Sequence, residues 1–326
     1  MRRRHFITLV GGAAAGLPLA ARAQQAAMPV IGFLHGASSE GYKPMVASFN
    51  QGLKEAGYVD GQNVAIEFRW AEGHFDRLPA MAADLVRRQV AVIVAGGTPA
   101  AFAAKAATSI IPTVILVGSD PVQLGFVGSL NRPEGNVTGL AILTVELEAK
   151  KLELLHELLP AATAIALLVN PANVLSQSET KDVEDAARSL GVRLHILNAS
   201  TESQIDAAFA GLAELRASAL VVSVDTFLNN SRGQIVALAA RYAVPAVYGV
   251  RDFVNAGGLM SYGTDLVDVY RQQGTYAGKI LKGAKPTDLP IQQVTRVALI
   301  INLKTAKTLG LTFPTTLLGR ADEVIE

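Results

Sequence analysis

The chain of 326 residues contains no cysteine. It therefore forms no disulfide, offers no thiolate to a metal or to a reaction, and has no cysteine for lipid attachment after an export signal. The five histidines show neither HExxH nor any other paired spacing typical of a zinc site. We expect no metal and no cofactor.

Motifs of common enzymes are missing as well. The sequence has no GxSxG nucleophile elbow, no GxxxxGK(S/T) phosphate loop, and no GxGxxG turn after a strand. No apolar segment is long enough to cross a bilayer. These absences argue against an enzyme of a familiar class and against a membrane-spanning protein.

The N-terminus has the pattern of an export signal. Three arginines at residues 2–4 precede an apolar segment that ends in Ala-Arg-Ala at residues 21–23, the small-x-small form of a signal-peptidase site. Residues 1–23 are therefore predicted to be a cleaved signal peptide. The run RRHFI resembles the core of a twin-arginine signal but lacks the usual preceding Ser or Thr and following Lys, so the export route stays open.

Charge gives the next constraint. The 23 residues of the signal carry four Arg and no acidic residue, so their removal leaves 303 residues with 25 basic and 28 acidic side chains, a net charge of −3. This balance does not suggest nucleic acid or an anionic membrane as a partner. We expect a soluble, monomeric periplasmic protein with two domains of ordinary size.

The segment AVIVAGGTPAA, residues 91–101, predicts a strand, a tight turn and the start of a helix. Its β-branched run suits a strand buried on both faces. Gly97 allows the turn, Thr98 is a good N-cap, and Pro99 stands where helices tolerate proline. The helix N-terminus would present unpaired N–H groups and could bind a carboxylate.

The order of elements around this segment occurs twice. Residues 30–120 and 165–252 each read as strand, helix, strand, helix, strand and strand, with few identities. His35 then falls opposite Asn170, and Gly97 and Thr98 fall opposite Asp225 and Thr226. The pattern predicts an α/β fold of two doubly wound lobes, each with a parallel sheet, and a ligand cleft between them at the carboxyl ends of the strands.

We expect the first lobe to comprise residues 28–142 and 257–286, and the second lobe residues 143–256 and 287–326. In each half a Gly-flanked strand leads through a threonine into a long helix, which is typical of strands that cross between lobes as a hinge. Two ordinary βα connections are the alternative.

Side chains at the predicted strand ends are the candidates for ligand contact. A helix N-terminus on one lobe and the carboxylate of Asp225, or of Asp120, would suit a zwitterion such as an amino acid. Alternatively, Asp120 caps a helix, His35 is a hydrogen-bonded loop residue, and the tyrosines belong to the core. The predicted contacts are His35, Gly97, Thr98, Pro99, Ser119, Asp120, Asn170, Asp225, Thr226, Tyr248 and Tyr262.

Nearly the whole mature chain resembles the solute-binding proteins of ABC transporters, in the group that includes tryptophan- and tyrosine-type components. The stretches that carry the resemblance are GLKEAGYVDGQNVAIEFRWAEG, IVAGGTPAA, SDPVQLGFVGSLNRPEGNVTGL, KLELLHELLP and INLKTAKTLGLTFPTTLLGRADEVIE. Where many relatives have Pro-Thr-Asp-Asn, this chain has Ser-Val-Asp-Thr at residues 223–226.

The resemblance implies a type I periplasmic-binding fold, closure of the lobes around an amino acid or aromatic acid, and delivery to a membrane permease driven by a cytoplasmic ATPase. It also implies cleft contacts from Thr98, Asp120, Asn170 and Asp225. Two other functions remain open: a periplasmic sensor that presents its closed form to a receptor, and an exported α/β enzyme without a sequence signature.

Overall fold

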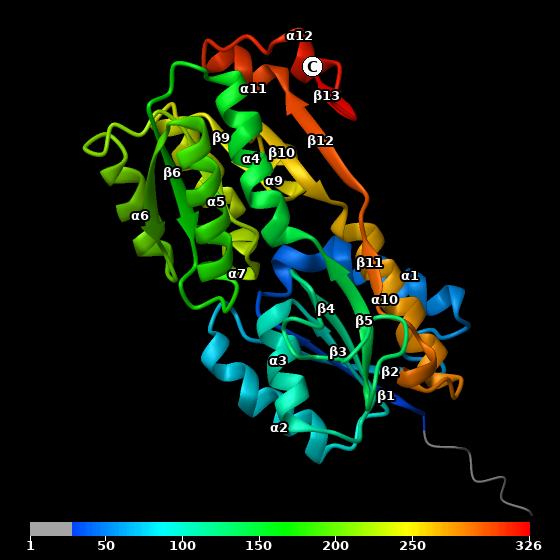
Figure 1. Ribbon diagram of the computed structural model, residues 1–326. Coiled ribbons are helices and arrows are strands. Elements are labelled where there is room, and N and C mark those ends of the chain that lie inside the picture. Colours follow the sequence, from blue (N-terminus) through cyan, green and yellow to red (C-terminus); the bar gives the residue numbers. More distant parts are fainter. Residues whose placement is uncertain (1–27) are drawn as a thin grey trace, which may run out of the picture.

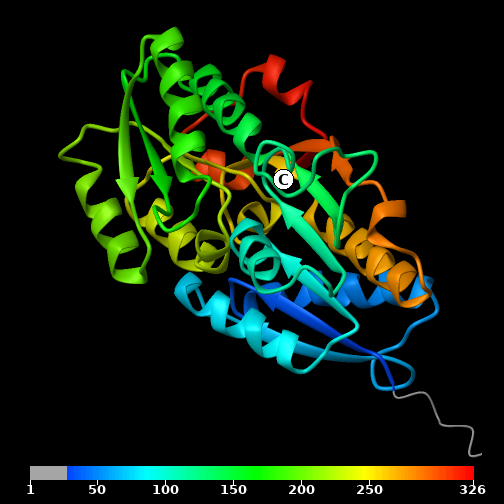
Figure 2. The same ribbon diagram turned by 60° about the horizontal axis from the view of Figure 1, so that its bottom comes forward.

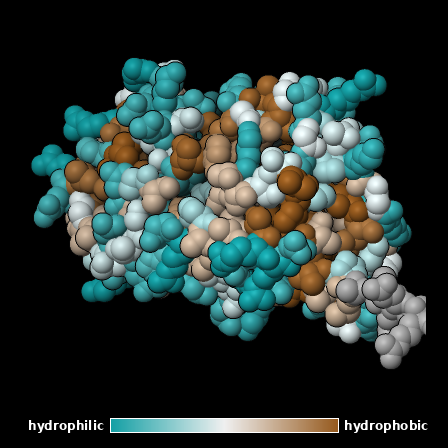
Figure 3. Space-filling model, turned by 90° about the horizontal axis from the view of Figure 1, so that it is seen from below, coloured by the Kyte–Doolittle hydropathy of each residue, from teal (hydrophilic) through white to brown (hydrophobic). Residues whose placement is uncertain are grey.

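The computed structural model describes residues 28–326 and shows two α/β lobes (Figure 1). The predicted signal peptide lies outside the described residues. Within them, none of the helices has the length and apolar character needed to cross a membrane. Figure 3 shows the face seen from below, where apolar residues lie among hydrophilic ones.

The first lobe is built on a sheet of six strands in the order β11-β5-β4-β3-β1-β2, all parallel. Its central strand β3 is a run of buried residues because helices cover both faces. The strands are β1 (Val30–His35), β2 (Ala65–Trp70), β3 (Val92–Gly96), β4 (Thr113–Val117), β5 (Val137–Ile142) and β11 (Gln292–Val294).

Side chains that alternate along β3 enter two different cores. Val92 and Val94 pack with α1 and α10, whereas Ile93 and Ala95 pack with α2 and α3. Figure 2 shows blue α1 beside orange α10 on one face of this sheet. The helices of this lobe are α1 (Lys43–Glu55), α2 (Leu78–Arg87), α3 (Thr98–Ala107), α10 (Leu266–Leu281) and the 3₁₀ turns η1 (Glu40–Tyr42), η2 (Phe75–Arg77) and η3 (Pro286–Asp288).

The second lobe contains a sheet of seven strands in the order β13-β12-β10-β9-β8-β6-β7. Five of them are parallel, and β12 and the edge strand β13 run in the opposite direction because β12 pairs antiparallel with β10. The strands are β6 (Ala164–Val169), β7 (Arg193–Asn198), β8 (Leu220–Val222), β9 (Ala246–Tyr248), β10 (Met260–Thr264), β12 (Val297–Asn302) and β13 (Glu323–Ile325).

Helices also cover both faces of the second sheet. Residues of α4, α5 and α12 share a core with Ile165 and Val221, and residues of α6 and α8 share one with Ala166 and Val222. The helices are α4 (Thr144–Leu158), α5 (Ser176–Leu190), α6 (Glu202–Gly211), α7 (Thr226–Asn230), α8 (Arg232–Arg241), α9 (Arg251–Asn255), α11 (Leu303–Thr308) and α12 (Thr315–Leu318).

The doubled architecture expected from the sequence is confirmed. The order β5-β4-β3-β1-β2 of the first sheet matches the order β10-β9-β8-β6-β7 of the second, element for element. The turn that opens α3 in the first lobe therefore corresponds to the turn that opens α7 in the second. Their capping residues, Gly97 and Asp225, occupy equivalent places.

The expected lobe boundaries need correction. The sequence predicts residues 257–286 in the first lobe, but β10 pairs with β9 and β12 in the second sheet. It predicts residues 287–326 in the second lobe, but β11 pairs with β5 in the first sheet. The chain thus crosses between lobes three times, after β5, β10 and β11, whereas the sequence predicts only the first two crossings.

Helices α1 and α10 approach each other closely through glycines. A Cβ on Gly274 would lie 2.1 Å from the carbonyl oxygen of Phe49, and one on Gly52 would lie 1.8 Å from the carbonyl oxygen of Arg271. Both obstacles are backbone atoms, which cannot rotate away. This contact anchors α10, and α10 carries the chain back from the hinge into the first lobe.

Substituting Gly274→Ala should therefore destabilise the protein by about 1–3 kcal/mol, the usual cost of an overpacked core, although alanine favours helix. The matched control is Gly233→Ala in α8, where an added Cβ meets nothing within 4 Å; it should be neutral or gain up to about 1 kcal/mol. Urea unfolding of both variants measures the difference. Equal effects of the two substitutions would refute the close-contact argument.

Candidate functional site

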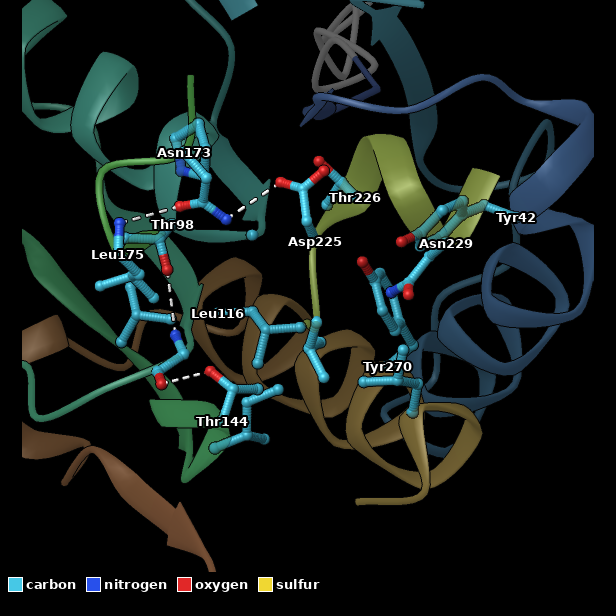
Figure 4. A pocket seen from close by; sticks show the side chains of 17 residues that line it. Tyr42, Thr98, Leu116, Thr144, Asn173, Leu175, Asp225, Thr226, Asn229 and Tyr270 are labelled. Atoms are coloured by element: carbon cyan, nitrogen blue, oxygen red, sulfur yellow. Dashed lines mark hydrogen bonds between the residues drawn. The ribbon is translucent and has the colours of Figure 1, made fainter. Parts of the chain in front are cut away.

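A cavity lies between the lobes at the carboxyl ends of the parallel strands (Figure 4). Its lining residues border about 460 Å³ of space not filled by atoms, part of which is open to solvent. Both lobes and the first and second crossings line it. The lining residues are Tyr42, Gly97, Thr98, Pro99, Leu116, Val117, Gly118, Ile142, Thr144, Asn173, Leu175, Val224, Asp225, Thr226, Asn229, Leu266 and Tyr270.

The N-terminus of α3 opens onto this cavity. Its cap is Gly97, which adopts φ 94°, a conformation that favours glycine, and has no side chain to accept from the first helical N–H groups. The first intrahelical bond runs from the Ala101 N–H to the Gly97 carbonyl, and Pro99 has no N–H. The N–H groups of Thr98 and Ala100 are therefore left for an anion.

Gly118, just after β4, is held from two sides. Its N–H donates to Thr98 Oγ1 at 3.0 Å, and its carbonyl accepts from the hydroxyl of Thr144 and, at 3.1 Å, from the Thr144 N–H. Thr144 begins α4 directly after the first crossing. These bonds connect the start of α3 to the hinge.

Asp225 faces α3 from the second lobe and is buried, with 3 % of its surface exposed. Its Oδ1 accepts from the N–H groups of Phe227 (2.8 Å) and Leu228 (3.1 Å) and from the Asn170 amide (3.1 Å). Its Oδ2 accepts from the Asn173 amide at 3.0 Å. Burial raises the pKa of Asp225, and these donors oppose the rise. Oδ2, with one protein donor, retains capacity for a ligand.

A buried ion pair supports the segment that carries Asp225. The Lys151 ammonium donates to Glu148 Oε1 at 2.7 Å and to the Val222 carbonyl at 2.8 Å, and Glu148 Oε1 also accepts from the Val224 N–H at 3.3 Å. Both charged side chains are fully buried. Burial, reinforced by the Glu148 carboxylate, raises the pKa of the neighbouring Glu179 well above its ordinary value.

The rest of the cavity wall is apolar or neutral. Leu116, Ile142, Leu175, Val224 and Leu266 supply aliphatic surface, and two tyrosines supply rings. No lysine or arginine is among the lining residues, so Asp225 is the one charged side chain. Such a wall favours a ligand with a large apolar part and no net charge.

Comparison with known proteins agrees with this geometry. Residues 30–325 match the family described as ABC transporter substrate binding protein. The chain belongs to this family. It is 29 % identical over 264 residues to the tyrosine-binding protein of Clostridioides difficile. The aligned region covers 81 % of this chain and 75 % of the relative.

Two solved structures show how the lobes of similar proteins are arranged. An ABC domain in complex with L-Trp from Streptococcus pneumonia is 27 % identical and superposes with a TM-score of 0.81. The ligand-free, open structure of a Clostridium difficile substrate binding protein with adhesive properties is 25 % identical, with a TM-score of 0.62. Each comparison covers 91 % of this chain and 99 % of the other. The lobes of this substrate-binding protein thus lie nearer to the L-Trp-bound arrangement.

Contacts between the lobes agree with that arrangement. A Cβ on Gly36 would lie 2.9 Å from Thr226 Oγ1, and a Cβ on Gly97 would lie 3.0 Å from Thr226 Cγ2. Ser38 of the first lobe also donates a hydrogen bond to Asn230 of the second. The start of α7 therefore packs closely against Gly36 and Gly97 of the first lobe, because these residues have no side chain.

Five of the eleven residues predicted from the sequence line the cavity, namely Gly97, Thr98, Pro99, Asp225 and Thr226. Two others lie directly behind it. Asn170 is buried and donates to Asp225, and His35 is buried and bonds the Tyr270 hydroxyl.

The other four predicted residues lie away from the cavity lining. Asp120 accepts from the Val122 N–H at 2.8 Å and caps a turn, where the alternative interpretation expected a helix, and Ser119 precedes it. Tyr248 stacks on Phe253 in the core, with ring centroids 4.4 Å apart. Tyr262 lies on β10, which belongs to the second sheet, and packs against a core.

Sequence reasoning missed five polar lining residues, which are Tyr42, Thr144, Asn173, Asn229 and Tyr270. Asn173 follows Asn170 in the loop after β6, and a second amide there was a usable signal. Tyr270 lies inside α10, where its position in an amphipathic pattern indicates only core packing.

The buried cluster under Asp225 makes a prediction about stability. Glu148→Gln leaves the Lys151 ammonium buried without its carboxylate and should cost about 3–5 kcal/mol. In the matched variant Glu179→Gln, a carboxyl whose pKa is raised by folding is replaced by a neutral amide. Wild type loses the stability that the protonated Glu179 contributes as pH rises from the ordinary pKa of a glutamate toward that raised pKa, so Glu179→Gln should be at least as stable as wild type at pH 8.

Thermal melts at pH 5 and pH 8 distinguish the two variants. Relative to wild type, the stability of Glu179→Gln should improve between pH 5 and pH 8, while Glu148→Gln should be destabilised at both. Equal losses of stability in the two variants at pH 8 would contradict the conclusion that Glu148, and not Glu179, is the ionised partner of Lys151.

Proposed function

We propose that this protein captures an amino acid with an aromatic or large apolar side chain and delivers it to the permease of an ABC importer. The observation that carries the proposal is the lining of one cavity by a helix N-terminus, one carboxylate and apolar side chains, without a lysine or arginine. Such a lining matches a zwitterion better than a phosphate or a simple anion.

Each end of the zwitterion has a place. The ligand carboxylate binds the N-terminus of α3, where Thr98 and Ala100 have N–H groups outside the intrahelical bonding. The ligand ammonium binds Asp225 Oδ2. The side chain of the ligand packs against the aliphatic wall and the rings of Tyr42 and Tyr270. Relatives named for tyrosine binding and solved with L-Trp support this class.

The proposed cycle follows from the construction of the hinge. The lobes separate by changes at the three crossings, the ligand enters, and contacts from both lobes favour closure. A membrane permease with its cytoplasmic ATPase then receives the ligand. We further propose that residues 1–23 direct export to the periplasm and are removed there, and that the protein is a monomer without catalytic activity.

Titration calorimetry of the mature protein tests the ligand class. We expect L-tryptophan or L-tyrosine to bind, and analogues that lack one charged group to bind at least about tenfold more weakly, because each loses a charge-assisted contact. Indole-3-propionate lacks the ammonium, and tryptamine lacks the carboxylate. Binding of sugars in place of amino acids, or equal affinity for all three indoles, would refute the proposal.

Asp225 gives the binding a defined pH dependence. Only the ionised carboxylate attracts the ammonium, so affinity should fall as pH decreases through the pKa of Asp225, which burial raises above its ordinary value. Asp225→Asn should weaken L-tryptophan binding about 10- to 100-fold and abolish this pH dependence, while leaving indole-3-propionate little affected. Asp265→Asn, at the cap of α10 outside the cavity, is the control. If Asp225→Asn weakens the binding of L-tryptophan and of indole-3-propionate equally, Asp225 has a structural role alone.

A further inference from the structure

Tyr270 is one of the residues that line the cavity, although it is almost completely buried. Tyr270 belongs to α10, which α1 anchors in the first lobe. Its Oη is 2.7 Å from Nε2 of His35, at the end of β1. The His35 ring is fully buried and packs beside the rings of Tyr42 and Trp70, with centroid distances of 4.2 and 5.2 Å.

The direction of the His35–Tyr270 hydrogen bond follows from the other side of the imidazole. The Ala37 N–H donates to His35 Nδ1 at 2.9 Å, so Nδ1 carries a lone pair and no proton. Burial lowers the pKa of His35 to about 3, so the ring is neutral at physiological pH. The single imidazole proton therefore resides on Nε2, and His35 donates to Tyr270.

Because Tyr270 accepts from His35, its own proton is left to donate. Among residues 28–326, the bond with His35 is the only hydrogen bond of the Tyr270 hydroxyl. Burial raises the pKa of Tyr270 well above its ordinary value, so the phenol keeps that proton. A buried donor without an acceptor costs free energy, and a ligand that accepts from it recovers that cost.

The position of the hydroxyl selects which part of a ligand it can reach. Oη lies 2.9 Å from the place a Cβ would take on Gly96, the residue that precedes the α3 cap Gly97. In Figure 4 Tyr270 lies on the cavity side opposite Thr98. Tyr270 and the N-terminus of α3 therefore both lie close to the turn at residues 96–97. Within the first turn of α3, Pro99 contributes no N–H donor.

We propose that Tyr270 donates a hydrogen bond to the carboxylate of the bound amino acid and that His35 is the positioning residue that fixes this direction. The inference rests on the proposed function and refines it. The free proton of the hydroxyl favours the carboxylate over the ammonium, because an ammonium has no lone pair to accept it. Selectivity for ligands with a carboxylate then comes from three neutral donors, the two N–H groups of α3 and this hydroxyl.

Tyr270→Phe is the direct test, because it keeps the ring and removes only the hydroxyl. The variant should bind L-tryptophan and indole-3-propionate about tenfold more weakly than wild type, the effect of one lost hydrogen bond to a charged group. It should bind tryptamine, which has no carboxylate, as wild type does. Displacement calorimetry measures the weaker ligands. An equal loss for tryptamine, or no loss for L-tryptophan, would overturn the inference.

His35 variants separate positioning from packing. His35→Gln retains an amide donor near the position of Nε2 and should bind L-tryptophan more tightly than His35→Leu, which has none. In the Tyr270→Phe background, the difference between the two His35 variants should disappear, because the hydroxyl that they orient is gone. A difference that persists in that background would overturn the positioning role.

Failure of the proposed function gives a different result from failure of this inference. If wild-type protein binds none of L-tryptophan, L-tyrosine and their analogues, both proposals are refuted. If wild type binds the amino acids and Tyr270→Phe binds them equally well, only the role of Tyr270 is refuted. Melting temperatures of the ligand-free variants exclude unfolding as the cause of a loss. Tyr270→Phe replaces one unpaired buried donor, the Tyr270 hydroxyl, by another, the His35 Nε2–H, and should therefore melt close to wild type.

Discussion

The hydrogen bonds of the Asp225 carboxylate determine the shape of the second-lobe side of the site. One oxygen satisfies the first N–H groups of α7, and the amides of Asn170 and Asn173 hold both oxygens in place. Asn170 is itself fixed, since its Oδ1 accepts from Ser200 at 2.7 Å. A carboxylate with this many donors can remain buried and ionised beside a cavity, and the buried Lys151–Glu148 pair supports the strand end from which it projects.

The two lobes repeat one architecture but differ at the residue that caps the equivalent helix. Because of that difference, one side of the cavity offers hydrogen-bond donors and the other side offers an acceptor. At α7 the cap is a carboxylate that satisfies its own helix. At α3 the cap is Gly97, so the helix N–H groups remain available. A repeat with Asp at both caps would place two carboxylates face to face, and one with Gly at both would offer donors only. The observed pair gives a donor side and an acceptor side.

Much of this could be predicted from the sequence, because local patterns specify it. Buried runs such as residues 92–95 specify parallel strands, and the order of elements specifies the doubled lobes. The third crossing could not be predicted, because β11 is three residues long and mostly exposed. Tyr270 and the Lys151–Glu148 pair could not be predicted either, since nothing local distinguishes a side chain that meets a partner far away in the sequence from one that packs in a core.

In the proposed function, Gly97 also links ligand binding to closure of the lobes. Its positive φ allows the turn into α3, and its missing Cβ leaves room for Thr226 of the opposite lobe. In the proposed cycle, the same residue presents the helix N-terminus to a ligand and accepts the second lobe when the cleft closes. A ligand held by α3 on one side and Asp225 on the other makes its full set of contacts only in the closed arrangement. Its binding free energy therefore differs between the open and closed states, which is the condition under which a ligand can shift the population toward closure.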